Sequence, residues 1–166
     1  VKAAAVGDVL RFPHGDFMKV NYLGIDDRAT INITIEFLLE AEKDGQPGFV
    51  TVNTLLPHHT PGLGYHMPPD CRQQAEQMIW NGKKWDDVSD KEKYRGALLC
   101  QDIFLGELYN SLHQAELLNR TSFVLAGDHG ESFPEDRGLD RHGGSAWDEG
   151  LRVPVLVAPR PPPAAA

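Results

Sequence analysis

Residues 124–144, VLAGDHGESFPEDRGLDRHGG, place an acid and two imidazoles on one polar loop. Asp128 and His129 directly follow an apolar run, and His142 lies at the far end of the loop. A carboxylate oxygen and an imidazole nitrogen are both ligands for divalent metals, and Gly130 lets the backbone turn sharply beside them. Two ligands do not complete a metal site. The residues therefore leave two interpretations: a metal site that other donors complete, or a solvated turn in which Asp128 caps nearby amides.

A second histidine-rich loop, PHHTPGLGYHMPPD, follows another apolar run. His59 in this loop and His142 in the first could donate hydrogen bonds to a phosphate or sulfate group, or act as general acids. For each histidine alone, a solvated loop position is the alternative. In open α/β sheets, however, the loops that leave the carboxyl ends of the strands converge. The pair therefore predicts one shared site for an anionic group.

The elements that must position these loops alternate between helix and strand. Apolar residues at helical spacing predict helices over about 26–45, 72–80 and 89–118, and Ser89 with Glu92 forms a capping box at the start of the last one. Short β-rich apolar runs predict buried strands over 49–56, 121–127 and 152–159. This order predicts an α/β fold with a mainly parallel sheet flanked by helices.

Composition narrows the class of protein. The chain has 166 residues, of which 41% are hydrophobic and 24% charged, as in an ordinary globular domain. A net charge of −8 without a basic cluster argues against nucleic acid as a partner. No apolar run is long enough to span a bilayer. Cys71 and Cys100 are the only cysteines and do not form a C-x-x-C motif, so we expect two buried or free thiols.

Three segments together carry a family resemblance: PGFVTVNTLLPHHTP, YRGALLCQDIFLGELYNSLHQAELLNRTSFVLAGDHGE and RHGGSAWDEGLRVPVLV. From about residue 26 to residue 159 the chain resembles the carboxyl-terminal half of the sulfatase domain. This domain belongs to the alkaline-phosphatase-like superfamily, which also contains phosphoethanolamine and phosphoglycerol transferases. The resemblance implies that Asp128 and His129 are neighbouring metal ligands. It further implies that His59, in the family's H-x-P segment, contacts sulfate or phosphate oxygens, and that His142 is a substrate-side histidine.

The chain also departs from the family pattern. Classical sulfatases often have a lysine near the position of His142, so this histidine keeps the transferase alternative open. The family's nucleophile lies in a C/S-x-P-x-R segment of the amino-terminal half, or is a threonine in the transferases. Neither that segment nor the family's first acidic metal-binding segment occurs in these 166 residues. We therefore expect residues 1–160 to form an incomplete sulfatase-like domain that is inactive by itself, followed by a Pro/Ala tail at 161–166.

The function that the resemblance implies is metal-dependent hydrolysis of a sulfuric ester. A phosphoryl-group transferase, or a non-catalytic module that binds a metal or an anion, are the alternatives. The expected cofactor is a divalent metal, calcium for a sulfatase and zinc or manganese for a transferase, and the expected substrate is a sulfate or phosphate ester. Members of the family are secreted, periplasmic, lysosomal or membrane-associated. The sequence leaves the compartment, the physiological ester and the oligomeric state open.

Overall fold

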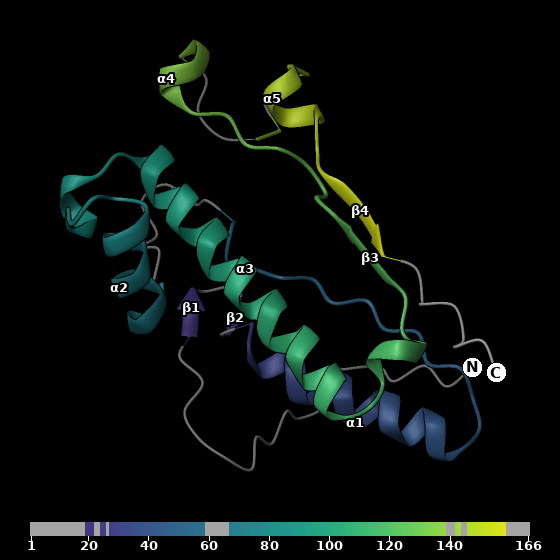
Figure 1. The fold of residues 1–166 in the computed structure, drawn as a ribbon. Helices are drawn as coiled ribbons and strands as arrows, with labels where there is room; N and C mark the ends of the chain where they lie inside the picture. The colour runs from purple at the N-terminus through teal and green to yellow at the C-terminus, as the bar shows by residue number, and fades with distance from the viewer. Residues whose placement is uncertain are drawn as a thin grey trace.

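The computed structural model describes residues 19–21, 24–25, 27–58, 67–138, 142–143 and 146–158. Its helices are α1 (Ala29–Lys43), α2 (Pro69–Met78), α3 (Asp90–Gln114), α4 (Pro134–Arg137) and α5 (Asp148–Leu151), with short 3-10 turns η1 (Trp85–Asp87) and η2 (Leu118–Arg120). Its strands are β1 (Lys19–Asn21), β2 (Gly24–Ile25), β3 (Phe123–Ala126) and β4 (Val155–Ala158). Figure 1 shows α1 and α3 lying along one another, α2 beside the beginning of α3, and α4 and α5 at one end of the β3–β4 ribbon.

Helix α3 is the longest element and confirms the helix predicted from residue 89. Ser89 Oγ accepts a hydrogen bond from Glu92 N (3.3 Å), and Glu92 Oε2 accepts one from Ser89 N (3.0 Å). The bond from the Ser89 backbone lowers the pKa of Glu92, because it favours the charged carboxylate. The helix ends at Gln114 rather than near residue 118. None of the helices in the described part of the chain is long and apolar enough to cross a membrane.

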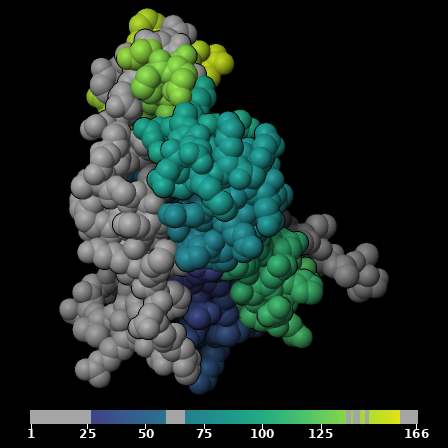
Figure 2. All heavy atoms as spheres, turned by 90° about the vertical axis from the view of Figure 1, so that its left-hand side faces the viewer, coloured from purple at the N-terminus to yellow at the C-terminus, as the bar shows by residue number. Residues whose placement is uncertain are grey.

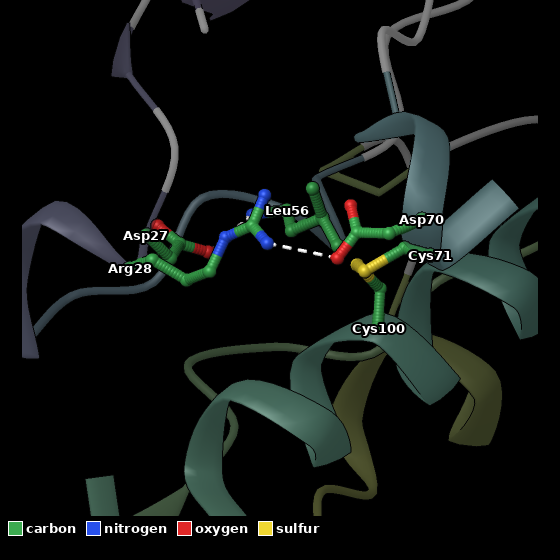
Figure 3. Close-up of a disulfide and its surroundings, with 6 residues drawn as sticks. All are labelled: Asp27, Arg28, Leu56, Asp70, Cys71 and Cys100. Atoms are coloured by element: carbon green, nitrogen blue, oxygen red, sulfur yellow. Dashed lines mark hydrogen bonds and ion pairs between the residues drawn. A yellow bond between two sulfur atoms is a disulfide. The ribbon is translucent and has the colours of Figure 1, made fainter. Parts of the chain in front are cut away.

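The core lies where α2 packs against α3. Cys71 and Cys100, one from each helix, form a fully buried disulfide with Cα atoms 5.3 Å apart (Figure 3). The expectation of two thiols was therefore wrong, because only the packing of the two helices brings these distant positions into bonding range. Trp80 donates a hydrogen bond from Nε1 to Glu92 O (2.8 Å). It also requires glycine at position 96, where a Cβ would lie 2.6 Å from the indole Cζ2.

The space-filling view of Figure 2 shows the outer side of this helical unit. Teal atoms of α2 and the first half of α3 occupy the middle of the visible face, and the light green and yellow atoms of α4 and α5 lie above them. The first turn of α3 is therefore the part of the helical core nearest to α4 and α5. The Tyr94 ring in α3 packs on Phe133, which directly precedes α4, with ring centroids 5.3 Å apart.

Residues 49–56, predicted as a buried strand, have no regular secondary structure. Part of their backbone is instead held by a side chain from the start of α1. The buried Asp27 carboxylate accepts hydrogen bonds from Leu55 N (2.9 Å) and Leu56 N (3.1 Å). The Asp27 side chain, just before α1, therefore anchors the segment that leads to His58.

Strands β3 and β4 confirm the positions of the two other predicted strands, but the prediction that they are buried was wrong, and they pair antiparallel. The register aligns Phe123 with Ala158 and Ala126 with Val155. The mainly parallel sheet is thus not seen among the described residues, whose strands form two separate antiparallel pairs. Parallel pairing needs a crossover to a neighbouring strand, and residues 49–56 do not provide that strand here. Both faces of the ribbon are apolar and open, with exposed fractions of 72% for Val124, 65% for Val155 and 57% for Leu156.

Replacing Asp27 with alanine is expected to destabilise the fold by about 1–3 kcal/mol, because the Leu55 and Leu56 amides lose their charged acceptor. Asp27→Asn retains one oxygen acceptor and should lose less. Urea unfolding followed by circular dichroism measures the change. Asp102→Ala, at an exposed position of α3, is the control and should stay within about 0.5 kcal/mol of the wild type. Equal stability of Asp27→Ala and the control would rule out the anchoring role.

Candidate metal and anion site

Three histidines from the two predicted loops lie together at the end of β3. The His129 and His142 rings stack with centroids 4.0 Å apart and an interplanar angle of 28°. The His58 ring meets the His142 ring edge-on, with centroids 5.4 Å apart. His59, the histidine expected to contact the anion, lies outside the described residues, so the first loop is represented at this cluster by its neighbour His58.

Asp128 and His129 present two donor atoms on the same side of the strand end. Their Oδ2 and Nε2 atoms are 3.6 Å apart, a separation that two ligands of one ion can have when metal–ligand distances are about 2.0–2.4 Å. His129 Nδ1 lies 2.9 Å from Gly130 O, which can only accept, so Nδ1 carries the hydrogen and Nε2 keeps its lone pair. The Asp128 side chain is 90% exposed. This pair therefore fits the first ligands of a divalent metal.

These two residues do not complete a coordination shell. The described part of the chain contains no group of three or more His, Cys, Asp or Glu side chains placed to hold a metal ion. Divalent metals in proteins take at least four ligands. Water, backbone oxygens or further side chains would have to complete the shell.

A buried acid lies beneath the histidine cluster. Glu131 is 4% exposed, and its Oε2 lies 3.0 Å from Nδ1 of His142. Its other oxygen, Oε1, is buried and has no hydrogen-bond partner in the described structure. The side chains therefore form two layers, with Asp128 facing solvent and Glu131 inside.

Tyr94, in the first turns of α3, is influenced by the charges of both acids. Its ring packs on Phe133 with centroids 5.3 Å apart. Burial raises the pKa of Tyr94, and the negative charges of Glu131 and Asp128 raise it further. The phenol is therefore neutral at physiological pH.

The raised pKa of Tyr94 predicts a loss of stability at alkaline pH. Folding favours the neutral phenol, so its contribution is fully present below the unfolded pKa of about 10 and is lost as the pH rises through the higher folded pKa. The free energy of unfolding of Tyr94→Phe should therefore fall less steeply than that of the wild type between about pH 9 and pH 11. Tyr109→Phe, at an exposed position of α3, is the matched control. Parallel pH curves for Tyr94→Phe and the wild type would contradict this assignment.

Sequence reasoning gave no role to three of these residues. Glu131 stands in the same DHGE string as the metal pair, and its distance from His142 along the chain hid their contact. His58 was passed over in favour of His59, which fits the H-x-P spacing. Tyr94 looked like one more apolar-face residue of a helix. The adjacency of Glu131 to a predicted metal pair was the one signal that could have drawn attention to it.

The acids and histidines gather at the carboxyl end of β3, and the carboxyl ends of strands are where α/β proteins commonly bind their ligands. Residues 11–163 match the family model described as Sulfatase, and the chain belongs to the sulfatase family. No curated protein and no solved structure matches the chain. The expectation of sulfatase-family membership is confirmed.

Membership of this family implies an alkaline-phosphatase-like α/β fold. Sulfatases are hydrolases that act on sulfate esters and generally use a divalent metal. The acid and histidine cluster at the end of β3 is therefore the part of the described structure in which this chemistry is best sought.

Proposed function

We propose that this chain contributes the metal-binding and anion-binding part of a metal-dependent sulfuric ester hydrolase. The observation that carries the proposal is the 3.6 Å separation of Asp128 Oδ2 and His129 Nε2, directly beside the stacked His142 ring. In this proposal Asp128 and His129 hold a divalent metal, and His59 and His142 contact the oxygens of the ester. The exposed Asp128 carboxylate leaves room for an ion and a substrate on the solvent side.

The residues of the cluster have separable tasks in such a reaction. The bound ion would supply stabilisation of the negative charge that develops on the ester and nucleophile oxygens. Histidine side chains beside it would donate hydrogen bonds to the transferred group, and His142 would orient the substrate or assist the leaving oxygen.

We further propose that residues 1–160 are part of a larger domain with a mainly parallel sheet, and that residues 161–166 are a tail. The open apolar faces of β3 and β4 support this, because an isolated two-stranded ribbon is marginally stable and sheets of α/β proteins have both faces covered. The nucleophile would come from a segment outside these 166 residues. A hydrophobic dye should fluoresce strongly with this chain and weakly with a complete domain; equal weak signals would contradict the proposal.

A phosphoryl-group transferase is the second candidate. It is favoured by the two histidines at positions 129 and 142, since imidazole ligands suit zinc or manganese better than calcium, which prefers oxygen. A non-catalytic module that binds a metal or an anion is the third. All three share the Asp128–His129 pair and differ in the metal and in the reaction.

An assay of the complete domain with two esters and three metals tests these candidates. A chromogenic sulfate ester and a chromogenic phosphodiester are each supplied with calcium, zinc or manganese. Sulfate release that depends on calcium supports the sulfatase, and turnover of the phosphodiester with zinc or manganese supports the transferase. Metal binding without turnover of either ester would overturn both enzymatic proposals in favour of the binding module.

A further inference from the structure

Two short segments of the chain have the pattern Asn-x-Thr, which is the acceptor motif for N-linked oligosaccharides. One is residues 32–34, Asn-Ile-Thr, and the other is residues 119–121, Asn-Arg-Thr. So short a motif also arises by chance, so its place in the fold must decide whether it is used. Neither segment takes part in the proposed ester site, and the two lie in different surroundings.

The motif at residues 119–121 lies on the exposed turn η2, between α3 and β3. Two of its side chains hold the turn in place. Thr121 Oγ1 donates a hydrogen bond to Leu117 O (2.9 Å), and Arg120 forms an ion pair with Glu42 of α1. The third side chain, Asn119, is exposed. A group attached to the Asn119 amide would therefore leave the contacts that hold the turn intact.

The motif at residues 32–34 lies within α1, a helix of 15 residues. Its threonine, Thr34, is only 7% exposed. Asn32 lines a groove between α1 and α3, together with Glu107 and Asn110 of α3. An oligosaccharide at Asn32 would have to fit beside the contact between these two helices, whereas acceptor motifs that are used lie on surface loops. The structure therefore favours Asn119 over Asn32.

The Cys71–Cys100 disulfide independently indicates the compartment that such a modification requires. Disulfides form and persist in oxidising compartments, such as the lumen of the endoplasmic reticulum, and are rare in the reducing cytosol. The bond is fully buried between α2 and α3 and uses both cysteines of the chain. N-linked oligosaccharides belong to secreted proteins, so the disulfide and the modification require the same route.

We propose that Asn119 is an N-linked glycosylation site and that Asn32 is not. In the transfer, Asn119 Nδ2 forms a bond to the anomeric carbon of the first sugar. The bond from that carbon to the pyrophosphate of a polyisoprenyl-linked oligosaccharide breaks, and the lipid pyrophosphate leaves with the electron pair. One amide hydrogen leaves Nδ2 as a proton, so nothing is oxidised or reduced. This inference goes beyond the proposed function and does not depend on it.

An oligosaccharide on Asn119 would stand away from the candidate metal and anion site. Figure 1 shows the chain entering β3 at the end of the ribbon opposite to α4 and α5. Asn119 precedes β3, whereas Asp128 and His129 follow the other end of the same strand. The modification should therefore leave metal binding and ester turnover unchanged.

Peptide mapping of the full-length protein, expressed in eukaryotic cells, tests the proposal. The purified protein is treated with peptide N-glycosidase in ¹⁸O-labelled water, which converts a modified asparagine into labelled aspartate. Mass spectrometry of the peptides then locates the label. We expect the label at position 119 and none at position 32.

Variants of the two motifs provide the controls. Asn119→Gln and Thr121→Ala should each abolish the mass that the glycosidase removes, whereas Thr121→Ser keeps the acceptor motif and should retain that mass. Asn32→Gln is the matched control and should also retain it. Thr121→Ala loses the hydrogen bond to Leu117 O and should melt at a lower temperature. Asn119→Gln should melt at the temperature of the deglycosylated wild type, so this variant separates the modification from folding.

Three results would overturn the proposal. The first is an unlabelled position 119 in protein that carries the Cys71–Cys100 bond. The second is an unlabelled position 119 in protein with two free thiols, which would also remove the argument from the oxidising compartment. The third is label at position 32, which would overturn the preference for one motif over the other. None of these measurements uses ester turnover, so failure of the proposed function would leave the test of Asn119 intact.

Discussion

Replacement of Asp128 by alanine in the complete domain is expected to reduce metal affinity by at least about 100-fold, because changes to residues that only support a ligand already cost about 10–100-fold. Asp128 contributes the charged oxygen of the pair, and its Oδ2 lies 3.6 Å from His129 Nε2. Its Oδ1 accepts a hydrogen bond from His129 N (2.9 Å), so the variant also loosens the partner ligand. One substitution therefore weakens both donors.

The rate of ester hydrolysis should fall as bound metal is lost. A catalytic metal supplies several kcal/mol of charge stabilisation, which corresponds to a rate loss of about 10³-fold or more. Elemental analysis of the purified domain measures the metal, and release of a chromogenic alcohol measures the rate. Asp148→Ala is the control, since Asp148 is an exposed acid of α5 that pairs with Arg152. An Asp128→Ala domain with full metal content and full activity would remove Asp128 from the site.

Loss of the Cys71–Cys100 disulfide should cost about 3–4 kcal/mol of stability, estimated from loop closure over a sequence separation of 29. The bond joins α2 to α3 inside the main core, where the neighbouring side chains include Leu56 (Figure 3). For a chain of this size, such a loss lowers the melting temperature by roughly 10 °C. Thermal unfolding of the Cys71→Ala/Cys100→Ala variant measures it.

A reducing agent gives the control for this prediction. Reduction should lower the melting temperature of the wild type and leave that of the variant without cysteines unchanged. Titration of the denatured, unreduced chain with a thiol reagent should find no free thiol. Two free thiols in that titration would contradict the disulfide and support the original expectation from sequence.

Local signals predicted the helices well. The Ser89–Glu92 capping box located the start of α3 because both of its hydrogen bonds lie within one turn of chain. The contacts made at the start of α1 could not be predicted in this way. The Asp27 carboxylate accepts hydrogen bonds from the backbone of residues 55 and 56, which only the tertiary structure brings to it.

The sequence pattern could not predict which distant segments pair with one another. Residues 49–56 have the composition of a strand, yet a strand forms only when another backbone is in register with it. The same limit hid the disulfide, since nothing in the spacing of two cysteines reveals that two helices bring them together. At the site, the rule that loops converge at strand ends predicted that the two histidine loops meet, and His58 lies beside His142. The contact of His142 with Glu131 has no such signal in the sequence.

The β3–β4 ribbon has a consequence for biosynthesis. Each strand pairs only with the other in the described structure, so each leaves one row of backbone groups open beside exposed valine and leucine side chains. Open, apolar strand edges are templates for pairing between chains. The ribbon is therefore where misassembly and aggregation of newly made chains should begin, and where a chaperone would bind first.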